Sequence, residues 1–270
     1  MAAINAAGLA MFPPGQELEA ANFLKNTWMN LNQKDIYVDW PLGIINGVLF
    51  QKGFFNNAPY IDYANYFLNN ATFKRKFSIG AINANDGKYY TVNETTSLTK
   101  LKQYFVASAA IAGYFPYSEI NNTAFIEGST LFAVDLFTAI QRCLIITGNV
   151  EQDIILDAVL LEENKSLEKN MTGAHSLVMA MRYFELNGYL MSTYYIQDVI
   201  RDFPNVTYRY LITPISKLPS GGIFGLDYNH NDIANMIDIG EKETTDYIKS
   251  HYNTDWKLKI AQRLEYIRGK

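Results

Sequence analysis

The chain has 270 residues, of which 49% are hydrophobic and 19% charged, and it carries a formal net charge of -4. This composition is typical of a globular protein that buries a large core. The acidic balance argues against a nucleic acid as partner, because binding to a phosphate backbone needs clustered Lys and Arg. The single cysteine, Cys143, excludes an internal disulfide and a cysteine-based zinc site. The three histidines lie far apart and no glycine-rich phosphate loop occurs, so we expect neither a metal nor another cofactor.

Nothing in the sequence marks a membrane span or a secretion leader. No apolar run reaches the length of a membrane-spanning helix. Residues 1–10 lack the basic and apolar regions of a signal peptide, so a signal peptide, if the protein has one, would lie ahead of residue 1. The composition leaves the compartment and the oligomeric state open.

The first half of the chain is predicted to mix helices and short strands. In chain order we expect a helix over 13–31, a loop or short helix over 40–53, a helix over 58–70, strands over 73–83 and 88–94, a helix over 97–113, and short strands over 115–120 and 124–129. Asp86-Gly87 between two β-rich runs is a strong hairpin signal.

The second half is predicted to alternate between helices and strands. We expect a helix over 133–148, strands over 153–161 and 206–214, a helix over 177–203, a glycine-rich loop over 220–225 and a last helix over 229–250. Residues 153–161 are an almost continuous apolar run, which predicts a strand buried on both faces. The alternation indicates an α/β fold with a mostly parallel sheet. No linker rich in Pro, Gly or Ser divides the chain, so we expect a single domain over 1–270.

Two serines lie in stretches that superficially resemble the nucleophile elbow of a serine hydrolase. Ser78 in KFSIGAINAND falls inside a predicted strand that turns back at Gly87, so no helix follows it. Ser176 in GAHSLVM has no strand before it, and bulky residues follow where the elbow needs glycine. We expect neither serine to be a nucleophile, because an elbow needs a strand, a sharp turn and then a helix.

A resemblance to a known family rests on residues 104–129, YFVASAAIAGYFPYSEINNTAFIEGS. This stretch is similar to the segment of patatin-like phospholipases in which a helix ends in Ser-Ala-Ala-Ile-Pro-Gly-x-Phe-Pro-Pro and a short hairpin then ends in Asp-Gly-Gly or Asp-Gly-Ala. Gly113, Pro116 and Gly128 match that pattern, while Ala112 stands at the usual proline position.

The first residues, MAAINAAGLAMFPPGQE, resemble the tail of the elbow in the same family, which reads Gly-x-Ser-x-Gly-Ala-x-Asn-Ala. In this comparison Ala2 stands at the last glycine of the elbow, and Ala3 and Asn5 match the residues that follow it. The serine, the strand before it and the oxyanion loop would all lie ahead of Met1. The resemblance therefore implies a patatin-like three-layer fold with a mostly parallel central sheet that lacks its first strand or strands, in a domain that starts just after the elbow.

The resemblance also suggests a position for the catalytic base. Glu127 stands where the Ser-Asp dyad of the family has its aspartate. Glutamate is a competent general base, but it is one methylene longer, and a displacement of about 1 Å can cost roughly a hundredfold in rate. Without a serine partner, we favour a hairpin-end carboxylate with no catalytic role.

Three functions stay open. The first is a relative of the patatin-like phospholipases that cannot hydrolyse lipid esters as written, a pseudoenzyme of lipid metabolism, because nucleophile and oxyanion loop are absent and the base is substituted. The second is a fragment of a longer and active lipid acyl hydrolase. The third is a lipid-binding or interaction module with a lipid or membrane surface as partner, in which aromatic patches at 54–67 and 189–195 line a cleft.

Overall fold

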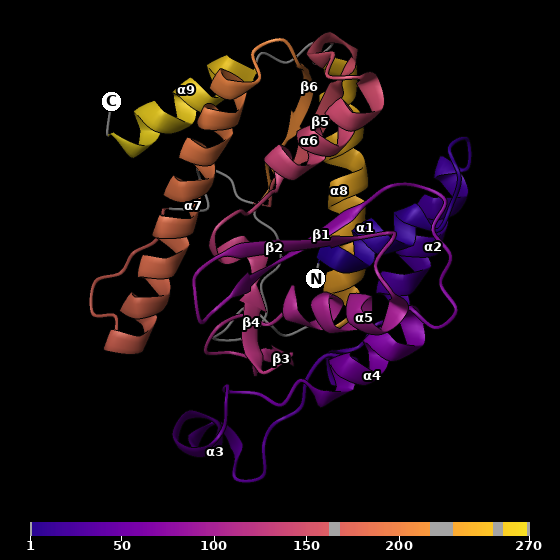
Figure 1. Cartoon of the computed structure of the whole chain (residues 1–270). Coiled ribbons are helices and arrows are strands. Elements are labelled where there is room, and N and C mark those ends of the chain that lie inside the picture. The colour runs from indigo at the N-terminus through magenta and orange to yellow at the C-terminus, as the bar shows by residue number, and fades with distance from the viewer. Residues whose placement is uncertain (1, 162–167, 217–228, 251–255, 269–270) are drawn as a thin grey trace. The chain divides into compact units, whose positions relative to one another are not determined.

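The computed structural model describes residues 2–161, 168–216, 229–250 and 256–268, which form two compact units (Figure 1). The first unit contains residues 2–129 together with 229–237, and the second contains residues 130–216 together with 238–268. Helices and strands occur in both, which confirms the α/β class. The expected single domain over 1–270 stays a prediction, as do the three-layer arrangement and the missing first strand.

The first unit is a four-stranded sheet covered by helices. Its strands are β1 (Ser78–Asn83), β2 (Tyr89–Asn93), β3 (Ser118–Ile120) and β4 (Thr123–Glu127), and they lie in the order β2-β1-β4-β3. Its helices are α1 (Ala2–Ala10), α2 (Glu17–Asn30), α3 (Gly43–Phe50), α4 (Ala58–Phe67) and α5 (Leu98–Ala107). Helix α5 contacts all four strands, α4 packs on α5, and α1 packs on α2 and β1.

All three strand pairings in this sheet are antiparallel, so the expectation of a mostly parallel sheet is wrong here. Two of the pairs are hairpins whose connections are too short for a parallel crossover, which needs a dozen or more residues. The β1–β2 hairpin turns at Gly87, which has a φ of 73°, as the Asp-Gly signal predicts. The β3–β4 hairpin turns at Asn121 and Asn122, whose φ angles are 51° and 59°.

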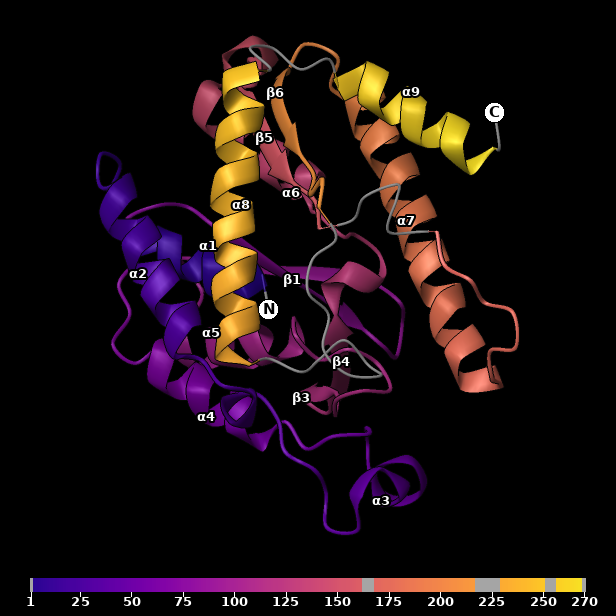
Figure 2. The ribbon, with the colours of Figure 1, turned by 180° about the vertical axis from the view of Figure 1, so that it is seen from behind.

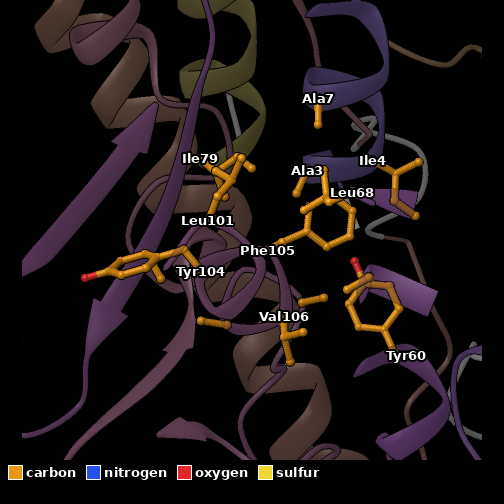
Figure 3. Close-up of a cluster of buried hydrophobic side chains, with 14 of the residues drawn as sticks. Ala3, Ile4, Ala7, Tyr60, Leu68, Ile79, Leu101, Tyr104, Phe105 and Val106 are labelled. Carbon is orange, nitrogen blue, oxygen red and sulfur yellow. The ribbon is translucent and has the colours of Figure 1, made fainter. Parts of the chain in front are cut away.

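A single core holds the first unit together. Apolar side chains from α1, α4, α5 and the sheet form one buried cluster, part of which is drawn in Figure 3. Ile4, Leu101 and Phe105 have no exposed surface. Phe55 and Tyr60, which the sequence suggested as the wall of a cleft, belong to this core.

The second unit contains the parallel pair β5 (Ile155–Val159) and β6 (Thr207–Ile212). Its other described elements are α6 (Leu136–Thr147), the 3-10 helix η3 (Glu151–Asp153), α7 (Ser176–Asp202), α9 (Trp256–Ile267) and the later part of α8 (His230–Ser250). Its buried cluster draws on the two strands and on α6, α7 and α9. Figure 2 shows the ribbon from behind, with β5 and β6 adjacent.

The strand β5 is not buried on both faces, contrary to the prediction from its apolar run. Leu156 and Ala158 are buried, whereas Ile155 and Val159 are 58% and 62% exposed. Its side chains therefore alternate, as in a strand with one covered face. The predicted loop at 220–225 lies outside the described residues.

The core of the first unit predicts a clear difference between two leucine truncations. Leu101 has no exposed surface and Leu18 is 71% exposed. We expect Leu101→Ala to lower the free energy of unfolding by about 2–5 kcal/mol, because it leaves a cavity. The matched control Leu18→Ala should change it by no more than about 0.5 kcal/mol. Urea titration followed by circular dichroism measures both, and equal losses would contradict the assigned core.

Candidate functional site

The candidate site lies at the end of β4, where Glu127 is positioned by pairing on one side and by a helix end on the other. Glu127 lies opposite Ala81 of β1 in the antiparallel register. Its backbone N–H donates to the carbonyl oxygen of Ala110, just beyond α5, over 3.0 Å. Both contacts use the backbone, so they fix the end of the strand whatever side chain it carries.

The next residue, Gly128, lets the chain lie very close to the backbone of β1. A Cβ atom placed on Gly128 would lie 2.7 Å from the carbonyl oxygen of Gly80, closer than Cβ atoms approach a backbone oxygen. The position therefore needs glycine for lack of space. Gly128 begins the short 3-10 turn η2 (Gly128–Thr130), which contains Ser129.

Glu127 faces a small cavity of about 20 Å³. The cavity is lined by Ile36, Asn57, Tyr60, Ala109, Ile111, Phe115 and Glu127, all from the first unit. A water molecule needs roughly 10–15 Å³ of such space, so the cavity has room for one water and no larger group.

Burial governs the charge state of the two titratable groups at this cavity. Removal from water raises the pKa of Glu127, and a hydrogen bond with the Ser129 side chain acts in the opposite direction. Burial also raises the pKa of Tyr60 well above its usual range, helped by the nearby charges of Tyr63 and Glu127. The site therefore favours a neutral tyrosine beside a carboxyl group that holds its proton more tightly than usual.

The Tyr60 hydroxyl is buried and has no hydrogen-bond partner within the described part of the chain. Its ring stacks on Phe105 with the centroids 5.8 Å apart. In Figure 3 the hydroxyl is turned toward the side of the cluster where Ala3 and Ile4 of α1 lie. A buried hydroxyl without a partner costs free energy, so a water in the adjacent cavity would stabilise it.

The three residues suggested as the remnant of an elbow lie in α1 in three different environments. Ala3 is buried in the core of the first unit, and Ala2 is exposed at the start of α1. The side chain of Asn5 accepts a hydrogen bond of 2.8 Å from the indole N–H of Trp28, which fastens α1 to α2. Asn5 is therefore engaged in packing between helices.

Gly113 and Pro116 lie in the loop between α5 and β3. Gly113 has a φ of 84°, a conformation that favours glycine, and its carbonyl accepts from the backbone N–H of Phe54 over 2.9 Å. The backbone of Phe115 and Pro116 packs so closely on Gly53 that a side chain there would clash. This loop closes one end of the cavity through Phe115.

Sequence reasoning missed Tyr60 and Asn57, which bring a hydroxyl and an amide to the cavity from α4 and the residue before it. Both lie far from Glu127 in the chain, and no local pattern marks them.

Ser78 lies within β1 opposite Asn93, and Ser176 begins α7. No group of three or more His, Cys, Asp or Glu within the described ranges is placed to hold a metal ion.

Comparison with known proteins gives one family. The family model described as patatin-like phospholipase matches residues 1–140, which include every residue of the candidate site. None of the curated proteins matches the chain.

The close approach of Gly128 to Gly80 predicts a costly substitution. We expect Gly128→Ala to lower the free energy of unfolding by about 1–3 kcal/mol, because the backbone of β1 must shift. Gly240→Ala in α8 is the matched control. No atom lies within 4 Å of the added Cβ, and alanine should stabilise the helix by about 0.5–1 kcal/mol. Urea titration measures both, and an unchanged Gly128→Ala variant would contradict the contact.

The raised pKa of Glu127 predicts how stability depends on pH. The native state keeps the proton of Glu127 over a pH range in which the unfolded chain has lost it, so this residue lowers native stability as the pH rises through that range. Glu127→Gln removes the effect. The free energy of unfolding of Glu127→Gln, relative to wild type, should therefore increase as the pH rises above the usual pKa of a glutamate, about 4.3. Glu19→Gln, which changes an exposed glutamate, controls for net charge. A constant difference for Glu127→Gln would refute the burial argument.

Proposed function

Because the chain belongs to the patatin-like phospholipase family, we propose that it derives from lipid acyl hydrolases and that Glu127 holds the position of the dyad base. We propose further that residues 1–270 on their own do not hydrolyse lipid esters by the Ser-Asp mechanism. The observation that carries this proposal is the cavity at Glu127, which at about 20 Å³ admits one water. Pockets that hold organic ligands are more than tenfold larger, at roughly 300 Å³ or above.

The neighbours of Glu127 support the same conclusion. Dyad chemistry needs a serine hydroxyl within hydrogen-bond reach of the base and backbone N–H groups directed at the developing oxyanion. The hydroxyl that helps to lower the pKa of Glu127 belongs to Ser129, which lies two residues further on in the 3-10 turn that follows β4. Ser129 lies in the 3-10 turn after β4, and the next α-helix, α6, begins only at Leu136. No helix follows the serine directly, so it lacks the elbow that supplies oxyanion donors. We assign Ser129 a role in holding the carboxyl group.

A second candidate is an active hydrolase in which a segment outside residues 1–270 supplies the serine. One observation favours it, namely that α1 and the end of β4, which would surround the catalytic residues, are folded and packed in this chain. Ala3 and Ile4 hold α1 in the core, and Glu127 directly precedes the close approach of Gly128 to β1. The upstream coding sequence distinguishes the two candidates. An in-frame strand followed by Gly-x-Ser-x-Gly supports the second, and a stop codon directly upstream of Met1 excludes it.

An ester assay tests the first candidate. We expect residues 1–270 to hydrolyse p-nitrophenyl butyrate no faster than buffer and to form no covalent adduct with a fluorophosphonate probe, because none of Ser78, Ser129 and Ser176 lies in a nucleophile elbow. Ser129→Ala and Glu127→Gln should leave this background unchanged. Turnover that the probe abolishes and that Ser129→Ala removes would overturn the proposal and identify Ser129 as the nucleophile.

A further inference from the structure

Helix α3 and its flanks, residues 40–51, form a surface that the function above does not use. We propose that this segment, named here the apolar tip, docks the protein on a lipid bilayer. Six large aliphatic or aromatic side chains of the tip are 39–91% exposed. They are Leu42, Ile44, Ile45, Val48, Leu49 and Phe50. In Figures 1 and 2, α3 lies at the end of a loop that projects from the other elements of its unit.

The tip carries no charge. Residues 40–51, WPLGIINGVLFQ, contain no Asp, Glu, Lys or Arg, although 19% of the whole chain is charged. A helix on a protein surface normally turns a charged or polar face to water. A continuous exposed apolar patch marks an interaction site, whereas isolated exposed apolar residues do not.

The polar groups of the tip bond within it and its base. The Asn46 side-chain amide donates to the carbonyl of Pro41 over 2.7 Å, and the Trp40 indole N–H donates to the carbonyl of Gly53 over 3.0 Å. The backbone N–H of Gly43 donates to the carbonyl of Trp40 over 2.7 Å. Internal bonding of this kind suits an apolar surrounding, which offers polar groups no replacement for water.

The backbone holds the tip in one shape. Leu42 has a φ of 71°, a conformation that costs energy for a bulky side chain, and its side chain is 91% exposed. Gly47 lies directly against the backbone carbonyls of Gly53 and Phe54 and leaves no room for a side chain. The strained backbone of Leu42 gains its side chain no packing contact in water. This points to an interaction of the exposed leucine with a partner.

The residues at the base of the tip match the chemistry of a membrane interface. The Lys52 ammonium lies 4.4 Å from the centroid of the Tyr117 ring and 3.7 Å from the Glu119 carboxylate. Together with Trp40 these groups combine aromatic rings with a cation, the combination enriched at the level of lipid headgroups. An apolar tip above such a base fits a bilayer better than it fits a second protein, whose interface would add polar and charged partners around the apolar centre.

The tip is too short to cross a bilayer. Helix α3 has 8 residues, whereas a spanning helix needs about 20. No helix within the described ranges is long and apolar enough to span a membrane. The tip would therefore insert shallowly, with its apolar side chains just below the headgroups. The inference accords with a lipid-hydrolase ancestry but does not depend on turnover, since binding is measured without a substrate.

Co-sedimentation with vesicles tests the inference on the whole chain. We expect the wild type to pellet with vesicles of neutral phosphatidylcholine, because the apolar side chains carry the binding. Ile45→Ser/Leu49→Ser should weaken partitioning at least about tenfold. The matched control is Ile145→Ser/Ile146→Ser in α6. Its side chains are 78% and 62% exposed, against 72% and 65% for Ile45 and Leu49, and it should bind as the wild type does.

Two further measurements leave no result ambiguous. Thermal unfolding of both double variants checks that each is folded, and sedimentation velocity without vesicles measures self-association. Absence of wild-type binding, equal binding by the tip variant, or equal losses in both variants would overturn the inference. A wild-type dimer that Ile45→Ser/Leu49→Ser converts to monomers, without vesicle binding, would assign the tip to a second copy of the chain instead. The ester assay is independent, so failure of one proposal leaves the other standing.

Discussion

The arrangement of the first unit depends on the close approach of Gly128 to the backbone of Gly80. β1 pairs with β2 along one edge and with β4 along the other, which makes it an inner strand of the sheet. Because Gly128 adds no side chain between itself and the carbonyl of Gly80, β4 can end directly against β1. That end point puts Glu127 beside the cavity, and the bond to the carbonyl of Ala110 ties the same point to the end of α5. The close approach of Gly128 to Gly80 therefore determines both where β4 ends in the sheet and where Glu127 lies at the site.

Local chemistry was enough to predict the hairpins but could not predict how they pair with each other. Asp86-Gly87 and Asn121-Asn122 specify their own turns, because Gly and Asn tolerate positive φ at little cost. The β1–β4 pairing joins segments separated by a strand, a helix and a hairpin, and no short-range signal encodes it.

The apolar run at 153–161 led to the wrong prediction of a strand buried on both faces for a similar reason. Ile155 and Val159 suit a strand whether it is covered on one face or on two. Their residue types therefore cannot show how many faces of the strand are covered.

The site was predictable only where its residues belong to a motif. Glu127 and Gly128 follow from a contiguous stretch that resembles a known family, and both lie at the end of β4. Tyr60 reaches the same cavity from α4 through tertiary packing, so nothing in its sequence neighbourhood reveals it. The segment around α3 was recognisable as a loop or short helix. Its exposure arises because α3 projects from its unit, which composition alone does not determine.

The core of the first unit also bears on the order in which the chain folds. Every residue of that core lies between Ala3 and Phe125, although the unit also takes in residues 229–237 from α8. A ribosome releases the chain from its N-terminus, and compact parts condense as they emerge. All the side chains of this core therefore emerge before those of the second unit, so α1 can be shielded from solvent early in synthesis. The portion of α8 that belongs to the first unit arrives last and adds to a core that is already complete.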